Sequence, residues 1–321
     1  MGEIMKSKKI IFLLLIVVVL LTGCTKTLKD GKEVIKNPET GQNLTQNILC
    51  RPTDKDLIKI YSKYEDKVDL GSLPDCEDFK INTGHDEGLW TNIFVKPLAW
   101  IIISFGKILK NYGLALIVTT LVIRFAAFPL TKKTAMQSEL IKQAQPELDR
   151  LEKKYEGKND QESMIKKTQE MQLIYRKYNI NPLAGCLFAF IQLPVFIAFF
   201  EAINRVPAIF EDTFLGLYLG TTPATAIGHG QFQYLIIVVI LAFVTYYSFK
   251  MNSTTSQNNQ TAMMTKSMTI MIIVMSIFMT TALDIYWLTS SLFTIGQNLL
   301  IKRSKKEWKN MSFLEKQEKN H

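Results

Sequence analysis

Residues 112–130 read YGLALIVTTLVIRFAAFPL, an apolar run that a single charge, Arg124, interrupts. A transmembrane helix requires about 20 predominantly apolar residues, so this run is long enough to cross a bilayer. Comparable runs occupy 182–203, 232–249, 268–283 and 285–301. The sequence therefore predicts an all-α polytopic membrane protein with five transmembrane helices.

The charges are distributed as a membrane protein requires. The 321 residues are 47% hydrophobic and carry 38 Lys and Arg against 29 Asp and Glu, a formal net charge of +9. These charges crowd between the apolar runs and are almost absent from them. Such clumping excludes a soluble enzyme and an intrinsically disordered chain. Basic residues at the cytoplasmic ends of membrane helices account for the net charge without a nucleic-acid ligand.

The N-terminus has the features of an export signal. A basic stretch at 5–9 precedes an unbroken apolar run of twelve residues at 10–21. This run is short for a span and typical of a signal peptide. It ends in the sequence LTGC at 21–24, which resembles the bacterial lipobox. We expect a lipoprotein signal peptide over 1–23 and a lipidated Cys24 as the mature N-terminus outside the cell. An ordinary signal anchor with an incidental cysteine is the alternative.

The segment 24–89 is polar, contains no membrane-length run, and is predicted to be a largely loop-like extracellular region. Cys50 and Cys76 lie in it, and a disulfide is chemically permitted outside the cell. Their spacing does not decide between a bond and two free thiols. Residues 90–110 place Trp and Lys around an apolar centre, a pattern typical of an amphipathic helix on the outer membrane surface. A true span is the alternative for this segment.

Basic residues set the predicted orientation. The stretch 132–177 holds eleven Lys and Arg, 302–319 holds seven, and 204–231 holds only Arg205. Five spans and an external start place both basic regions in the cytoplasm, as the positive-inside rule requires. The predicted localisation is the bacterial plasma membrane, with a basic cytoplasmic tail over 304–321.

A cytoplasmic helical hairpin is predicted between the first two spans, over 132–180. Apolar residues recur there at spacings of three or four, which form a narrow stripe on a helix, and 157–160 supplies a turn. So thin a stripe indicates a mobile element that rests on the membrane or on a partner; a solvated coiled-coil spacer is the alternative. The stripe consists of Met136, Leu140, Ala144, Leu148, Leu151, Tyr155, Met164, Thr168, Met171, Tyr175 and Tyr178.

Arg124 is the costly residue of the predicted spans. It lies about 18 Å along its helix from Tyr112, where an arginine costs about 2.5 kcal/mol on insertion scales. Asp284, at the outer end of the last span, differs from it in depth by roughly 15 Å, which disfavours an ion pair. We therefore expect Arg124 to face a water-filled cavity; snorkelling to the inner headgroups is the alternative. The polar candidates for the cavity wall are Thr119, Thr120, Gln192, Ser248, Ser276, Thr289, Ser290 and Gln297.

A fixed positive charge in a wet cavity has a clear physical use. It lowers the cost of bringing an acidic peptide segment into the bilayer, because a carboxylate meets a counter-charge at low effective dielectric. Arginine does not deprotonate in proteins, so the site cannot relay protons. These properties disfavour a proton-coupled pump.

Several ordered motifs resemble the YidC/Oxa/Alb family of membrane protein insertases. They are YGLA at 112–115, IRF at 123–125, PLT at 129–131, QPE at 145–147, NPLAGC at 181–186, QLP at 192–194 and YW at 286–287. The resemblance extends from residue 90 to the end of the chain, and the lipobox resembles the Gram-positive branch.

The resemblance implies a five-helix insertase core over 111–303, with a hydrophilic groove that is open to the cytoplasm and to lipid. It implies that Arg124 attracts the extracellular tail of the substrate and that the hairpin receives the substrate first. The predicted groove residues beside Arg124 are Thr120, Gln192, Ser248, Trp287 and Ser290.

The predicted function is that of a membrane protein insertase and chaperone, not an enzyme, that works with or without the Sec translocon. We expect no cofactor and no metal, because His85, His229 and His321 all lie outside the spans. The expected partners are nascent integral membrane proteins, the Sec translocon, the ribosome and membrane lipids. A small-solute or ion transporter is the alternative, but it predicts inverted repeats, and the sequence shows no such repeat.

Overall fold

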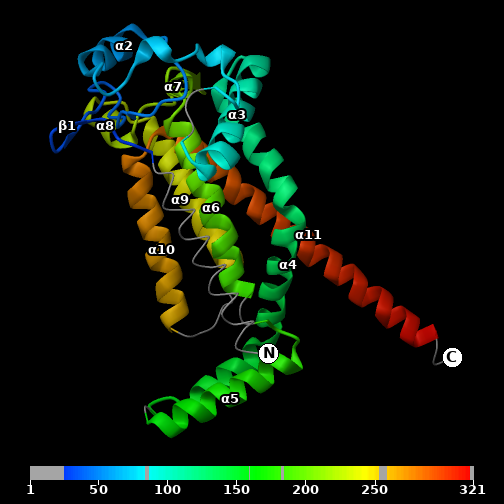
Figure 1. The fold of residues 1–321 in the computed structure, drawn as a ribbon. Helices are drawn as coiled ribbons and strands as arrows, with labels where there is room; N and C mark the ends of the chain where they lie inside the picture. The colour runs from blue at the N-terminus through cyan, green and yellow to red at the C-terminus, as the bar shows by residue number, and fades with distance from the viewer. Residues whose placement is uncertain (1–24, 84–86, 159, 182–183, 253–258, 319–321) are drawn as a thin grey trace. The chain divides into compact units, whose positions relative to one another are not determined.

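The structure is a computed structural model that describes residues 25–83, 87–158, 160–181, 184–252 and 259–318 (Figure 1). The predicted signal peptide, Cys24, His85 and His321 lie outside the described residues. Contacts divide the chain into two compact units, which are described separately. Unit 1 comprises Met1–Thr119, Gln192–Val238 and Ser276–Tyr286, and unit 2 comprises Thr120–Ile191, Val239–Met275 and Trp287–His321.

The segment predicted to be largely loop-like contains only short regular elements, and it packs around a core of its own within unit 1. Strands β1 (Lys29–Asp30) and β2 (Glu33–Val34) pair antiparallel, and helix α2 (Lys55–Tyr61) is followed by the short 3-10 helices η1 (Ser62–Tyr64), η2 (Leu70–Ser72) and η3 (Cys76–Asp78). One buried apolar cluster holds these elements together: Leu28, Leu44, Ile48, Leu57, Tyr61 and Val68. The sequence does not predict this cluster, because turns separate its residues at irregular intervals and neither a helical nor a strand period reveals them.

A disulfide closes this folded segment. Cys50 and Cys76 are bonded, with Cα atoms 4.8 Å apart and a sequence separation of 26. The bond answers the question that their spacing left open. A crosslink of this kind stabilises a domain chiefly by restricting the unfolded chain, by about 3 kcal/mol for a loop of this size.

The remainder of unit 1 includes two helical segments that precede α4 (Tyr112–Lys154). The π-helix η4 (Thr91–Val95) runs into α3 (Lys96–Leu109), and Lys110 ends α3 in the left-handed conformation, with φ of 51°. Residues Thr91–Leu109 are long and apolar enough to cross a membrane. The predicted surface helix is therefore not confirmed, and a true span fits this segment as well.

Short elements connect the longer helices of unit 1. They are α7 (Pro207–Phe210), the antiparallel strands β3 (Thr213–Phe214) and β4 (Leu217–Tyr218), and α8 (Pro223–Gly228). Pro207 and Pro223 stand at the first positions of α7 and α8, where the missing amide hydrogen costs no intrahelical bond.

In the described part of the chain, most of each apolar run predicted as a span is helical. Their helices are α4 (Tyr112–Lys154), α6 (Ala184–Asn204), α9 (Tyr234–Asn252), α10 (Asn259–Phe278) and α11 (Thr281–Glu318). Among the described residues, those long and apolar enough to cross a membrane are Thr91–Leu109, Tyr112–Lys132 and Tyr234–Met251, while Gln192–Asn204 and Thr269–Phe278 are shorter apolar helices. The helical class is confirmed, and the count of five spans stays a prediction.

The break between the last two predicted spans lies earlier than predicted. Helix α10 ends at Phe278 and α11 begins at Thr281, so the predicted boundary at 283–285 is wrong. Both the amide and the hydroxyl of Thr281 donate to the carbonyl of Thr221, at 3.0 and 2.8 Å. Hydrogen bonds to the loop at Thr221 thus accompany the break between α10 and α11. The hydropathy of the sequence does not predict such contacts.

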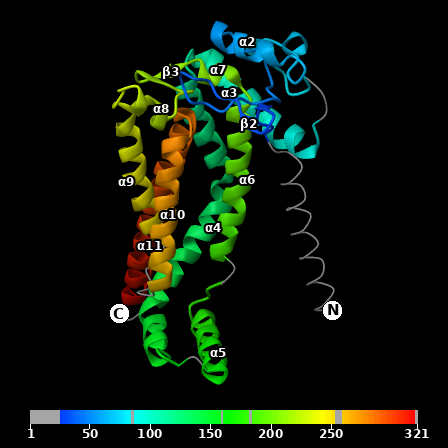
Figure 2. The ribbon, with the colours of Figure 1, turned by 90° about the vertical axis from the view of Figure 1, so that its left-hand side faces the viewer.

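In unit 2, α4 continues as one helix through Pro129 and Pro146. Helix α5 (Gln161–Lys177) then returns beside the last turns of α4, as both views show (Figure 1 and Figure 2). Gly157 in the turn adopts a positive φ of 76°, which glycine tolerates without steric cost. The side chain of Asp160 caps α5 by accepting a backbone hydrogen bond.

The hairpin is held by polar contacts as much as by its apolar stripe. Salt bridges join Lys154 to Glu170 and Lys177 to Glu147, each at 2.6 Å. Each of these glutamates also accepts a hydrogen bond from a tyrosine hydroxyl, at 2.9 and 2.8 Å. The stripe itself is only partly buried, since Met136 is 40% exposed. Exposed ion pairs are individually weak, so these contacts add little to the stability of the hairpin.

Removal of the disulfide provides a test of the folded segment 25–83. We expect Cys50→Ser to lower its free energy of unfolding by about 3 kcal/mol, because the unfolded chain regains the freedom that the crosslink removes. Limited proteolysis of the membrane-embedded protein would measure this as faster cleavage between residues 25 and 83. The double variant Cys50→Ser/Cys76→Ser should match the single variant; cleavage at the wild-type rate in both would contradict the structure.

Candidate functional site

Arg124 lies on α4 and is almost fully buried within the protein, with 8% of its surface exposed. Its Nη2 atom donates a hydrogen bond to Oγ of Ser290 on α11, and Ser290 is 3% exposed. An ionised side chain inside a membrane protein is costly unless polar groups surround it. Ser290 supplies such a group. Because its hydroxyl is a neutral acceptor, the hydrogen bond stabilises the guanidinium but does not neutralise its positive charge.

A second hydrogen bond repeats the same register along the two helices. The Thr131 hydroxyl of α4 donates to Oε1 of Gln297 on α11 at 3.2 Å. The partners of each hydrogen bond are 166 positions apart in the sequence. Thr131 lies seven residues after Arg124 on α4, and Gln297 lies seven residues after Ser290 on α11. Seven residues make two helical turns, about 10 Å. Helices α4 and α11 therefore run parallel here, as the first and last of five alternating spans would.

Buried polar side chains follow the contact between α4 and α11. We call this set the polar seam: Thr120, Arg124, Thr131, Ser290, Thr294 and Gln297, each 8% exposed or less. Positions three, four or seven residues apart share one face of a helix, so each helix contributes one polar stripe. The ring of Phe125 meets that of Phe293 edge to face at 5.1 Å beside the seam. The seam thus has an apolar border.

The structure distributes the other predicted groove residues over both units. In unit 2, Ser248 of α9 is 8% exposed and Trp287 of α11 is half-buried. Gln192 belongs to unit 1 and is half-buried. Thr119 and Ser276, which were predicted only for the cavity wall, also belong to unit 1 and are fully buried. Of the predicted groove set, a described hydrogen bond joins Arg124 and Ser290 directly.

Two residues of functional interest were not among the predicted groove residues. Thr131 belongs to the polar seam, and its place seven residues after Arg124 is a signal that could have identified it. Glu201 lies in α6 and is 2% exposed, and its Oε1 accepts a hydrogen bond from Nε1 of Trp90 at 3.0 Å. Glu201 is a single carboxylate near the end of the apolar run 182–203, so no periodic spacing in the sequence could have identified it.

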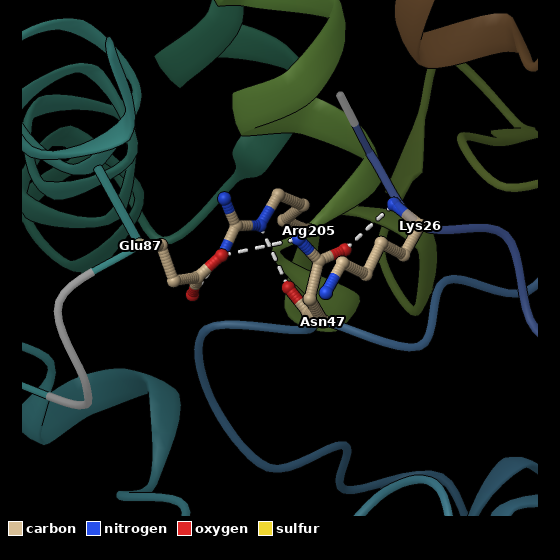
Figure 3. Close-up of polar contacts among 4 residues, drawn as sticks. All are labelled: Lys26, Asn47, Glu87 and Arg205. Atoms are coloured by element: carbon tan, nitrogen blue, oxygen red, sulfur yellow. Dashed lines mark hydrogen bonds and ion pairs between the residues drawn. The ribbon is translucent and has the colours of Figure 1, made fainter. Parts of the chain in front are cut away.

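A second buried arginine fastens the folded segment 25–83 within unit 1 (Figure 3). Arg205, at the end of α6, is fully buried, pairs with Glu87, and donates from Nε to the carbonyl of Asn47 at 2.7 Å. The Asn47 side chain donates to Glu87 at 3.1 Å and accepts from the backbone amide of Lys26 at 2.9 Å. This cluster ties the residues that directly follow the predicted lipidation site to unit 1.

Metal ligation finds no support in the described part of the chain. There, no group of three or more His, Cys, Asp or Glu side chains is placed to hold a metal ion.

The helices and the polar seam define a polytopic helical membrane protein with a buried charge on paired helices. A family model described as 60Kd inner membrane protein matches residues 104–309. That match covers more than half of the chain. The chain belongs to this family of inner membrane proteins.

Its relatives carry the name that the sequence motifs indicate. Membrane protein insertase YidC 2 of Bacillus anthracis is 40% identical over 223 residues, 68% of this chain and 84% of that protein. Insertase MisCA of Bacillus subtilis is 37% identical over 223 residues, 68% of this chain and 82% of that protein. Membrane protein insertase YidC of Oceanobacillus iheyensis is 36% identical over 223 residues, 69% of this chain and 86% of that protein. These relatives confirm the resemblance to the insertase family.

A crystal structure of an active YidC insertase with the first transmembrane domain resolved also aligns with this chain. The alignment has a TM-score of 0.49 and 23% sequence identity, and it covers 76% of this chain and 53% of that chain.

The hydrogen bond between Arg124 and Ser290 can be tested by truncating the hydroxyl. We expect Ser290→Ala to lower the free energy of unfolding by about 1.5 kcal/mol, the lower end of the range for bonds to charged groups, because water can replace part of the lost bond. Denaturation in lipid nanodiscs measures this difference. Ser291→Ala, the same change at the neighbouring buried serine, is the matched control. Equal losses in the two variants would count against the bond.

Proposed function

We propose that this chain is a membrane protein insertase and chaperone, whose polar seam forms part of a hydrophilic groove for its substrates. The buried guanidinium of Arg124, held by a neutral hydroxyl on a parallel helix, carries this proposal. The membership of the chain in a family whose named relatives are insertases supports it.

The groove would act through electrostatics rather than through covalent chemistry. A polar tail that enters the bilayer loses hydration, and an acidic tail loses the most. Arg124 offers such a tail a permanent counter-charge where the effective dielectric is low, so that their attraction is stronger than in water. The hydroxyl groups of the seam offer hydrogen bonds to the backbone of the tail in place of water.

The remaining groove residues complete the proposed path. Thr120 and Ser290 lie in the seam with Arg124, while Ser248 and Trp287 of the same unit are proposed to extend the polar surface. Gln192, in unit 1, remains a predicted groove residue. The hairpin is proposed to receive the substrate first, because its exposed ion pairs and partly buried stripe let it open at low cost.

The proposed topology has five spans, the segment 24–89 outside the cell, and the hairpin and tail in the cytoplasm. Lipidation of Cys24 would anchor the mature N-terminus, and the Arg205 cluster would hold the residues after it against unit 1. The proposed partners are nascent integral membrane proteins and membrane lipids, with the Sec translocon and the ribosome as candidates for delivering substrate.

Substitution of Arg124 tests the role of its charge. In cells depleted of their own insertases, we expect Arg124→Ala to reduce insertion of a single-span substrate with an acidic exported tail about tenfold, the effect of losing one charge-assisted contact. Arg124→Lys should retain part of the activity, because it keeps the charge but not the planar fork of donors. Protease protection of the exported tail measures insertion.

Two controls separate the groove charge from general effects. Lys132→Ala removes an exposed charge from the same helix, and this variant should insert the acidic-tailed substrate normally. A substrate with a neutral tail needs no counter-charge, so Arg124→Ala should insert it normally. Insertion of the acidic tail at the wild-type level in Arg124→Ala would contradict the proposal. The transporter alternative predicts that depletion changes solute fluxes first and leaves insertion intact.

A further inference from the structure

A second polar site lies in unit 2, at the end of the membrane-length helix Tyr234–Met251. It is a cavity of about 340 Å³, far larger than the roughly 30 Å³ that one water occupies. One lysine from each of three helices lines it: Lys142 of α4, Lys250 of α9 and Lys302 of α11. The cavity begins just past the contact between Thr131 and Gln297, where the polar seam ends.

The charges around this cavity are unbalanced. Its lining contains three ammonium groups against the single carboxylate of Glu139. Burial lowers the pKa of Lys142; the Glu139 carboxylate opposes this shift, and the Lys302 ammonium adds to it. A lowered lysine pKa means that the protonated form is disfavoured at this place. An anion between the lysines would relieve both the desolvation and the mutual repulsion.

One of the lysines is held in place by the fold. The Lys142 ammonium donates to the backbone carbonyl of Met251, in the last turn of α9. The last carbonyls of a helix lack intrahelical partners and carry partial negative charge, so a lysine is favoured there. The backbone of α9 thus fixes the position of Lys142, so one wall of the cavity is held by a specific contact of the fold.

The other lining residues indicate the kind of anion. Tyr247 and Asn298 add polar groups, while Ala135, Met251, Leu299 and Ile301 add an apolar wall. Lysine and tyrosine at the end of a membrane helix lie at the depth of the lipid headgroups. A ligand with a phosphate at one end and a glycerol backbone with acyl chains at the other matches this lining.

We propose that the cavity binds the headgroup of an anionic phospholipid, with Lys142, Lys250 and Lys302 around its phosphate. The proposal rests on the membrane placement of α9 and goes beyond the insertase function. A lipid in this cavity would join three helices at the point where α4 leaves the membrane to enter the hairpin. It would thereby fix the base of the hairpin while leaving its tip free.

The test uses the full-length protein in phosphatidylcholine nanodiscs that contain phosphatidylglycerol as a minority lipid. Native mass spectrometry after release counts the phosphatidylglycerol molecules that stay bound. We expect the wild type to retain phosphatidylglycerol over phosphatidylcholine, and Lys250→Gln and Lys302→Gln each to weaken retention about tenfold, as the loss of one bond to a charged group does. Lys250→Arg should retain the lipid.

Matched controls decide between a site and a charged surface. Lys132→Gln and Lys153→Gln remove exposed charges outside the cavity lining and should leave retention unchanged. Equal loss in all four glutamine variants would show diffuse attraction to the surface and overturn the proposal. Displacement of phosphatidylglycerol by inorganic phosphate at equal concentration would identify a free anion as the ligand and overturn it as well.

Discussion

The burial of one guanidinium on α4 is the constraint on which the rest of unit 2 depends. Arginine does not lose its proton in proteins, and its charge costs about 2.5 kcal/mol or more inside a membrane helix. The hydroxyl of Ser290 offsets part of this cost by a hydrogen bond, and the other side chains of the polar seam surround the contact between α4 and α11 with polar groups. An apolar residue at position 124 would require none of them.

This constraint also orders the helices. The Arg124–Ser290 and Thr131–Gln297 bonds share one register, so they fix both the direction and the axial position of α11 relative to α4. The rings of Phe125 and Phe293 pack edge to face beside this pairing. The lysine-lined cavity begins one residue after Gln297 on α11 and four residues after Thr131 on α4, where the polar seam ends.

The sequence predicts the parts of this structure that depend on composition along one helix. Apolar runs locate α4 and α9, and a lone charge in such a run identifies Arg124. The sequence does not reveal which hydroxyl meets Arg124, because that depends on the register of two helices far apart in the chain. The end of α10 is similarly hidden, since Thr281 bonds to the carbonyl of Thr221 rather than to a local cap.

The folded segment after the predicted lipidation site shows a different limit. Its core residues, such as Leu28, Leu44 and Val68, are spaced by turns and carry no period. Cys50 and Cys76 permit a bond, but only the fold brings them together. The Arg205 cluster could be suspected, because Arg205 is the single basic residue between two apolar runs, yet its partners Glu87 and Asn47 lie more than a hundred positions away.

The central proposal is that water enters the polar seam around Arg124, although the side chains of the seam are almost fully buried within the protein. Single cysteines in a chain without other reactive thiols, treated with a membrane-impermeant thiol reagent, measure this directly. The account predicts that Arg124→Cys and Ser290→Cys react, and that Val122→Cys and Phe125→Cys do not, since these neighbours on α4 are exposed and apolar and so face lipid. Equal inertness at all four positions would mean a dry seam and would contradict the account.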